Sequence, residues 1–261
     1  MIETAQDVRD TVIEMLTAEL SCSETDLTDG KVHVRLRDPQ ARHKLAHRAF
    51  SPHPGRIGIA TLGTGGVVCV DEDHLEWAKT TFSGVTGDEL FMPGTLGKLS
   101  DRLLPENLTT YGPFPRFAAS HSGIEPIEAP LVYNIRVVDR TGSETIEQRE
   151  QWPNALFPDP AKTGRPTMIA GIAEHAGEIA AVCGASADSP TMWQLGIDVS
   201  PNHQGQGIAS ALVSAVTQAV LDAGNLPYYG TSSSNVPSMR SALSVGYKPT
   251  WIEVLSRPTI S

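Results

Sequence analysis

The part of the sequence with the clearest chemical meaning is a loop of small residues, 204–209, between two regular patterns. The loop reads QGQGIA, an apolar strand pattern precedes it at 193–199, and a helical pattern follows it. Glycine lets a backbone approach a ligand closely, and the first N–H groups of a helix have no partner within the helix. The order of strand, glycine loop and helix therefore predicts a binding site for phosphate or pyrophosphate.

Three classes of cofactor use loops of this kind, and the spacing of the residues separates them. A mononucleotide P-loop requires Lys followed by Ser or Thr after its last glycine, whereas Ile208 and Ala209 follow Gly207. A dinucleotide fingerprint requires a third small residue, for which Ser210 is marginal, and an acid about 20 residues further on, where Asn225 stands. Neither class fits the loop.

The loop does resemble the motif of a third class. Gln204-x-x-Gly207-x-Ala209 is similar to the Gln/Arg-x-x-Gly-x-Gly/Ala signature of the GNAT superfamily of N-acetyltransferases. The alternative is a glycine-rich helix start that serves packing alone. The surrounding sequence favours the family, because Val199-x-Pro201, Asn235 and Gly246-Tyr247 occur at family-like separations.

The resemblance covers roughly residues 131–254. Two segments, MWQLGIDV at 192–199 and YGTSSSN at 229–235, resemble a subgroup of stand-alone bacterial N-acetyltransferases that have an added N-terminal region. For the fold, the resemblance implies a GNAT-like mixed, mostly antiparallel central sheet flanked by helices, within the α/β (α+β) class.

The resemblance also implies how acetyl-coenzyme A, the acyl donor, is bound. The loop amides would bind its pyrophosphate, and backbone groups of a splayed strand would pair with the pantetheine arm. Asn235 matches the residue that holds the arm from the other side, although N-capping of the helix that contains Pro237 is an equal alternative. The predicted cofactor-binding residues are Ile197, Val199, Gln204, Gly205, Gln206, Gly207, Ile208, Ala209 and Asn235.

Acetyl transfer to an amine needs a neutral amine, a stabilised oxyanion and a proton for the departing thiolate. The backbone N–H near Ile197 is the family-like oxyanion donor. Asp198, an acid within an apolar strand, is the first candidate for the base, and the alternative is that it faces solvent or caps a loop. Glu174 and Asp188 are second choices, more simply explained as surface charges.

The proton donor for the thiolate departs from the family pattern. The usual tyrosine position, seven residues after the asparagine, is occupied by Ala242, which has no hydroxyl group. Either Tyr229 or Ser232 serves instead, or the thiolate leaves unassisted, since a thiol has a pKa of about 8.5. The predicted catalytic residues are Asp198, Tyr229 and Ser232.

The remaining elements are predicted from hydrophobic periodicity and turn residues. The first half begins with a helix, a strand and a hairpin, at 8–20, 32–36 and 56–70. The second half has a strand at 132–138, a helix at 143–155 and paired strands at 167–174 and 178–185, ahead of the loop.

Composition excludes several classes of partner. The formal net charge of -10 disfavours nucleic acids and anionic membranes as partners. Apolar residues make up 40% of the sequence, which is an ordinary value for a globular protein. Residues 1–20 contain acids and no long apolar run, so we expect a cytoplasmic protein without a signal peptide or membrane span. We expect no metal site, because the three cysteines are scattered and His43 and His47 lack a third ligand.

A polar, proline-bearing stretch at 119–130 predicts a domain boundary. We expect an N-terminal α/β region at 1–125, which shapes the acceptor pocket or is a degenerate copy of the GNAT-like fold, and a GNAT-like catalytic domain at 126–261. The functional hypothesis is an N-acyltransferase that moves an acetyl group from acetyl-CoA to a primary amine of a small molecule. The alternative is a non-catalytic acyl-CoA-binding sensor, and the sequence leaves the acceptor and the oligomeric state open.

Overall fold

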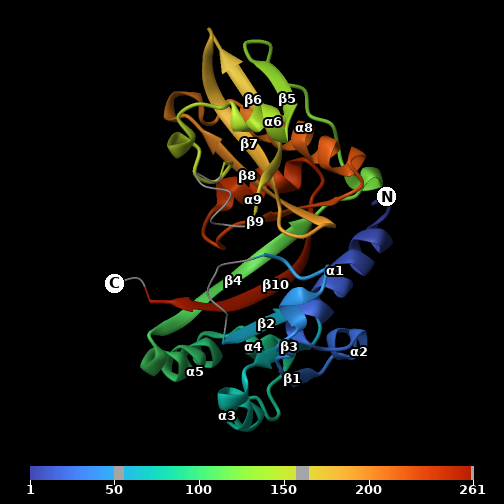
Figure 1. The fold of residues 1–261 in the computed structure, drawn as a ribbon, viewed down its shortest axis with the longest axis vertical. Helices are drawn as coiled ribbons and strands as arrows, with labels where there is room; N and C mark the ends of the chain where they lie inside the picture. The colour runs from blue at the N-terminus through green and yellow to red at the C-terminus, as the bar shows by residue number, and fades with distance from the viewer. Residues whose placement is uncertain (50–55, 157–164, 260–261) are drawn as a thin grey trace. The chain divides into compact units, whose positions relative to one another are not determined.

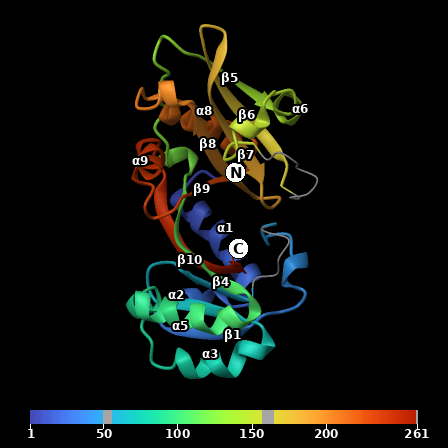
Figure 2. The same cartoon turned by 90° about the vertical axis from the view of Figure 1, so that its left-hand side faces the viewer.

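The computed structural model describes residues 1–49, 56–156 and 165–259, and its chain divides into two compact units. Unit 1 consists of Met1–Thr11 and Phe117–Pro249, and unit 2 of Val12–Arg116 and Thr250–Ser261 (Figures 1 and 2). The chain thus passes from one unit to the other at three points. The division into separate domains at 1–125 and 126–261 stays a prediction.

Unit 1 is built on a mixed sheet whose strands follow the order β9-β8-β7-β6-β5. Neighbouring strands are antiparallel, except that β8 and β9 are parallel. This mostly antiparallel sheet confirms the predicted fold class. The strands are β5 (Asn134–Asp139), β6 (Thr167–His175), β7 (Glu178–Ala187), β8 (Met192–Val199) and β9 (Leu226–Gly230); the helices are α6 (Arg140–Glu144), α8 (Ile208–Asp222) and α9 (Val236–Ser244), with 3-10 turns at His121–Gly123, Arg149–Gln151 and Pro201–His203.

Other segments of unit 1 pack on both faces of this sheet, to which the side chains of a strand point in alternation. Ala173 and Leu195 pack in the same core cluster as Leu212 of α8. Ile172 and Val182 pack instead against Trp152 and Leu156, in the segment that follows α6. The sheet therefore separates a layer that contains α8 from a layer formed by residues 146–156.

The helix predicted at 143–155 is wrong. The chain forms only α6 and a 3-10 turn there, and then enters a short turn at residues 152–156. Gln148 adopts a left-handed conformation with φ of 51°, which ends any continuous helix. Pro153 lacks an N–H group and disfavours the helical conformation of Trp152, whose ψ is 54°. Helical periodicity in this window is overridden by these two local breaks.

Unit 2 contains the order β1-β3-β2-β10-β4, in which β1 and β3 are parallel and the β2 pairings with β3 and β10 are antiparallel. The predicted N-terminal helix, first strand and hairpin are confirmed. The strands are β1 (Val32–Leu36), β2 (Ile57–Thr61), β3 (Gly66–Val70), β4 (Leu108–Ala118) and β10 (Lys248–Pro258); the helices are α1 (Ala5–Leu20), α2 (Glu24–Thr28), α3 (Leu75–Thr81), α4 (Gly87–Leu90) and α5 (Pro93–Leu103), with 3-10 turns at Ala41–His43, Glu72–His74 and Leu104–Glu106. No helix among the described residues is both long and apolar enough to cross a bilayer.

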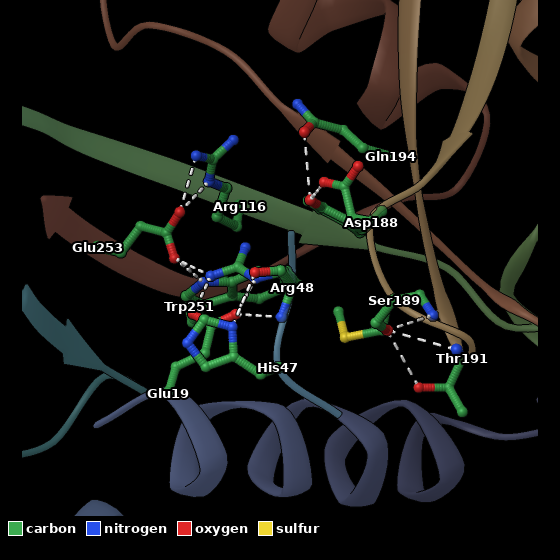
Figure 3. A network of polar contacts seen from close by, with 12 residues as sticks. Glu19, His47, Arg48, Arg116, Asp188, Ser189, Thr191, Gln194, Trp251 and Glu253 are labelled. Atoms are coloured by element: carbon green, nitrogen blue, oxygen red, sulfur yellow. Dashed lines mark hydrogen bonds and ion pairs between the residues drawn. The ribbon is translucent and has the colours of Figure 1, made fainter. Parts of the chain in front are cut away.

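A network of buried ions joins β10 to distant parts of unit 2 (Figure 3). The carboxylate of Glu253 is 2% exposed and lies 2.7 Å from nitrogens of both Arg48 and Arg116. Trp251 donates its indole N–H to the same carboxylate at 2.9 Å, and Arg48 also contacts Glu19 at 2.7 Å. Burial raises the pKa of Glu253, but the two guanidinium groups and the hydrogen bonds outweigh it and lower the pKa to about 2.

We expect Glu253→Gln to lower the free energy of unfolding by about 3–5 kcal/mol, because it removes the negative charge that two buried guanidinium groups share. Glu253 has its pKa lowered from 4.5 to about 2 in the folded protein. Its contribution is therefore complete above pH of about 4.5 and is lost as the pH falls towards 2. Denaturant titrations at several pH values measure both effects.

Glu76→Gln is the matched control, because Glu76 pairs with Lys79 at 2.8 Å on the surface. This exposed pair contributes no more than about 1 kcal/mol. Equal losses for the two variants would contradict the role of the buried network.

Candidate active site

The predicted phosphate loop has a backbone that only glycine adopts readily. After β8 the chain makes the 3-10 turn Pro201–His203 and then reaches Gly205 with φ of 74° and Gly207 with φ of 82°. Gly207 is the residue before α8, so two left-handed residues direct the chain into the helix. Positive φ values of this size are unfavourable for other residues.

The amides of this loop are available to a ligand. Within the described part of the chain, the N–H of Gln204 contacts Pro201 O at 3.4 Å, and the N–H groups of residues 205–209 have no protein acceptor. A Cβ atom added at Gly205 would meet no described atom within 4 Å, and one at Gly207 would meet only Pro130, at 3.9 Å. The loop thus presents unpaired donors and open space at the positive end of α8, which fits a pyrophosphate group.

Strand β8 separates from β9 just before the loop. Their paired residues end at Leu195 and Tyr229, while β8 continues to Val199 alongside β7. The N–H of Ser200 donates to Ala180 O at 2.9 Å, towards β7. Because successive backbone groups alternate in direction, those of Ile197 and Val199 point away from β7, to the side where the β9 ladder has ended. This is the arrangement that the pairing with a pantetheine arm requires.

One of these groups has a partner within the protein. The side chain of Gln204 donates from Nε2 to the carbonyl of Val199 at 3.3 Å. The first residue of the loop therefore ties the loop to the end of β8.

Asn235 acts as the N-cap of α9. Its Oδ1 accepts from the N–H of Ser238 at 3.2 Å, which confirms the capping alternative. A contact with the pantetheine arm is compatible with this cap, since Asn235 is exposed, and it stays a prediction.

The two predicted proton donors differ in environment. The hydroxyl of Tyr229 is buried beside Ser238 Oγ at 2.8 Å, and burial raises its pKa to about 12. Ser232 is exposed, and its Oγ lies 3.3 Å from Ser234 Oγ. Ala242, at the position where the family has tyrosine, is a small apolar side chain buried in the core.

Asp198 holds the turn at 152–156. Its Oδ2 accepts from the N–H groups of Asn154 at 2.8 Å and Ala155 at 2.9 Å, and its Oδ1 accepts from Asn154 Nδ2 at 2.6 Å. These bonds favour the second of the two interpretations, a cap for a neighbouring loop, over a base. The base role stays a prediction.

Two glycines allow the turn at 152–156 to lie close against the sheet. Gly184 on β7 and Gly196 on β8 are register partners. An added Cβ would lie 1.8 Å from Ala155 O at Gly184 and 1.8 Å from Asn154 O at Gly196. The backbone of residues 154–155 thus lies directly on the sheet, and any side chain at either glycine would displace it.

The second-choice bases are also engaged. Asp188 is 1% exposed, pairs with Arg165 and accepts from Tyr228, so it is buried, and its interpretation as a surface charge was wrong. Glu174 contacts Arg136 at 3.1 Å. Neither carboxylate is free of a cationic partner.

Tyr133 and His203 contact each other beside the loop and were not among the residues predicted from the sequence. The hydroxyl of Tyr133 lies 2.9 Å from His203 Nδ1 and 2.6 Å from Gln206 Oε1. His203 and Gln206 are 70 and 73 residues away from Tyr133 along the chain, so no local sequence pattern signals these contacts.

A family model matches the part of the chain that contains the loop. The model described as the acetyltransferase (GNAT) family matches residues 130–247, which include β5 to α9 and the glycine loop. These residues form a GNAT acetyltransferase domain. No curated protein matches the chain in sequence.

Several solved structures are similar to the chain that contains this GNAT domain. A GCN5-related N-acetyltransferase from Kribbella flavida is 18% identical, with 63% of each chain covered and a TM-score of 0.44. A GCN5-related N-acetyltransferase-like protein from Streptococcus suis is 15% identical over 62% of this chain and 68% of that one, with a TM-score of 0.43.

The putative acetyltransferase yncA from Salmonella typhimurium, solved with its cofactor acetyl-CoA, is 16% identical. It covers 50% of this chain and 95% of its own, with a TM-score of 0.35. The match covers less than two thirds of the Kribbella flavida chain. At these identities and TM-scores, the likenesses carry no conclusion about the substrate of the GNAT domain.

We predict that Asp198→Asn lowers the free energy of unfolding by about 1–3 kcal/mol, because backbone donors of the turn lose their carboxylate acceptor. The shape of the pH–rate profile should stay unchanged, since the carboxylate acts as a cap. Denaturant unfolding and rate measurements across pH check the two parts. A rate loss confined to pH values at which the acceptor amine is protonated would restore Asp198 as the base.

Proposed function

We propose that this protein is an acetyl-CoA-dependent N-acetyltransferase that moves the acetyl group to a primary amine of a small molecule. One observation carries the proposal: unpaired amides at residues 205–209 adjoin the point where β8 leaves β9, within a GNAT domain. The first feature suits the pyrophosphate of acetyl-CoA, and the second suits its pantetheine arm. Together they would direct the thioester towards Ile197.

In the proposed reaction the neutral amine nitrogen attacks the thioester carbonyl. A C–N bond forms and the carbonyl oxygen becomes negative, and the N–H of Ile197 would stabilise that charge. The carbonyl then re-forms as the C–S bond breaks, the amine loses a proton to a base, the departing thiolate takes up a proton, and the products are an amide and free CoA thiol. The direction of the Ile197 backbone, away from β7, is what supports this role.

The leaving thiolate sets a limit on what Tyr229 can do. A phenol with a pKa of about 12 is a much weaker acid than a thiol, whose ordinary pKa is about 8.5. Complete proton transfer from Tyr229 to the thiolate is therefore uphill. We propose that Tyr229 acts by donating a hydrogen bond, and the exposed Ser232 is the alternative donor.

The net charge of the chain supports the proposed class of acceptor. The chain has a formal net charge of -10, and such a surface attracts cations and repels anions. A small molecule with an amine group fits this field. A nucleic acid does not.

The competing proposal is a sensor that binds acyl-CoA without turnover, and Ala242 in place of the usual tyrosine favours it. Purified protein mixed with acetyl-CoA and a broad panel of amines separates the two. Release of free thiol that depends on an amine supports the enzyme. Measurable acetyl-CoA binding without thiol release across the panel supports the sensor.

For the cofactor site, we predict that Gly207→Trp raises the Kd for acetyl-CoA by at least about 100-fold, because the side chain occupies the space in front of the amides. Part of the effect could come from strain, since Gly207 has φ of 82°. Gly224→Trp is the control, because Gly224 has φ of 81°, follows the other end of α8 and has no described atom within 4 Å of an added Cβ, where Gly207 has only Pro130 at 3.9 Å.

Calorimetry with acetyl-CoA makes this comparison, and circular dichroism checks that both variants are folded. We expect Gly224→Trp to bind like the unmodified protein. An unchanged Kd in folded Gly207→Trp would refute the cofactor site.

A further inference from the structure

The hydroxyl of Tyr133 has contacts that the proposed reaction leaves unexplained. Tyr133 precedes β5, is 7% exposed and packs in the core cluster that contains Ile208 and Leu212 of α8. Its ring is fixed by the core, whereas its hydroxyl reaches two residues at the phosphate loop, His203 and Gln206. A rigid group is thus attached to a loop that must hold its shape to bind an anion.

The direction of each hydrogen bond follows from the chemistry of the partners. Gln206 donates from Nε2 to the carbonyl of Asn202 at 3.0 Å, and a carbonyl can only accept. This orients Oε1 of Gln206 towards Tyr133, whose O–H donates to it at 2.6 Å. The oxygen of Tyr133 is then left to accept from His203 Nδ1, which must carry a hydrogen.

The bonds therefore form a continuous chain. It runs from His203 through the hydroxyl of Tyr133 to the side chain of Gln206, and from there to the backbone of Asn202. Three of its four members belong to residues 202–206, at the start of the phosphate loop. Only Tyr133 comes from outside, so this chain of bonds reaches the core through one hydroxyl group.

The segment that bears Tyr133 is itself anchored at other points. His175, at the end of β6, donates from Nδ1 to the carbonyl of Val132 at 3.1 Å, and its ring centroid lies 5.5 Å from that of Tyr133. A Cβ added at Gly207 would lie 3.9 Å from the side chain of Pro130. Residues 130–133 thus run beside the loop and are fixed to the sheet.

We propose that Tyr133 is a positioning residue for the pyrophosphate of acetyl-CoA, a role that rests on the proposed function. It acts through His203 and Gln206 and touches no reacting atom. By holding the loop in the shape that presents the amides of residues 205–209, it removes the ordering cost that binding would otherwise bear. The effect should be confined to ligands that carry the pyrophosphate.

The test compares Tyr133→Phe with the unmodified full-length protein. Two probes are titrated by calorimetry or ligand-observed NMR: acetyl-CoA, and S-acetylpantetheine, which has the thioester arm without pyrophosphate. We expect Tyr133→Phe to raise the Kd for acetyl-CoA by about tenfold, the scale of one or two lost hydrogen bonds, and to leave that for S-acetylpantetheine unchanged.

Tyr247→Phe is the matched control. Tyr247 is also buried in unit 1, and its hydroxyl bonds to Thr217 Oγ1 at 2.7 Å, so the variant removes a buried hydroxyl from the same core cluster. We expect it to change neither affinity. An equal loss for both probes in Tyr133→Phe would show general destabilisation and overturn the positioning role.

Variants of His203 test the chain of bonds independently. His203→Asn keeps an N–H donor at the δ position, whereas His203→Leu removes it. We expect His203→Leu to weaken acetyl-CoA binding as Tyr133→Phe does, His203→Asn to stay within about twofold of the unmodified protein, and the double variant Tyr133→Phe with His203→Leu to add little. Independent, multiplying losses would contradict a shared chain.

The outcomes also separate this inference from the proposed function. If the unmodified protein binds no acetyl-CoA, both fail. If it binds acetyl-CoA and folded Tyr133→Phe binds equally well, only the role of Tyr133 fails.

Discussion

The proposed cofactor site depends on backbone groups that the fold leaves unpaired between the end of the β8–β9 ladder and the start of α8. β8 stops pairing with β9 after Leu195, and the chain then turns through Gly205 and Gly207 into α8. Amides in such a place are costly to bury and are normally satisfied by protein or water. Their concentration at one helix start is what makes the region suited to an elongated ligand with both amide and phosphate groups.

In the proposed site the loop would bind an anion through geometry and neutral dipoles, since residues 204–209 contain no lysine or arginine. Neutral donors hold an anion well only when they already point to the same place, because each hydrogen bond must offset the ordering of the loop. This requirement explains why the surroundings of the loop are so well connected. Gln204 is tied to Val199, and Gln206 is tied to Tyr133 and Asn202.

Much of this arrangement could be predicted from the sequence, because the signals were local. The glycine spacing of the loop and the helical pattern directly after it are signals of this kind, and the structure has the loop and helix where they were expected. The prediction of a helix at 143–155 failed for a local reason too, since the left-handed conformation of Gln148 and the proline at 153 override the helical periodicity.

What could not be predicted were contacts between distant residues. Asp198 caps Asn154 across 44 residues, and Tyr133 reaches Gln206 across 73. Gly196 lies in a strand whose pattern gives no sign of the backbone packed against it. A side chain's role in such cases is set by tertiary packing, which residue types alone do not record.

The central claim is that the amides of residues 205–209 bind a pyrophosphate, and amide chemical shifts measured by NMR during titration with CoA test it most directly. The account predicts that these five amides shift with CoA, that pantetheine leaves them unchanged, and that pantetheine still shifts the amides of Ile197 and Val199. Saturating CoA that shifts other amides but none at 205–209 would contradict it.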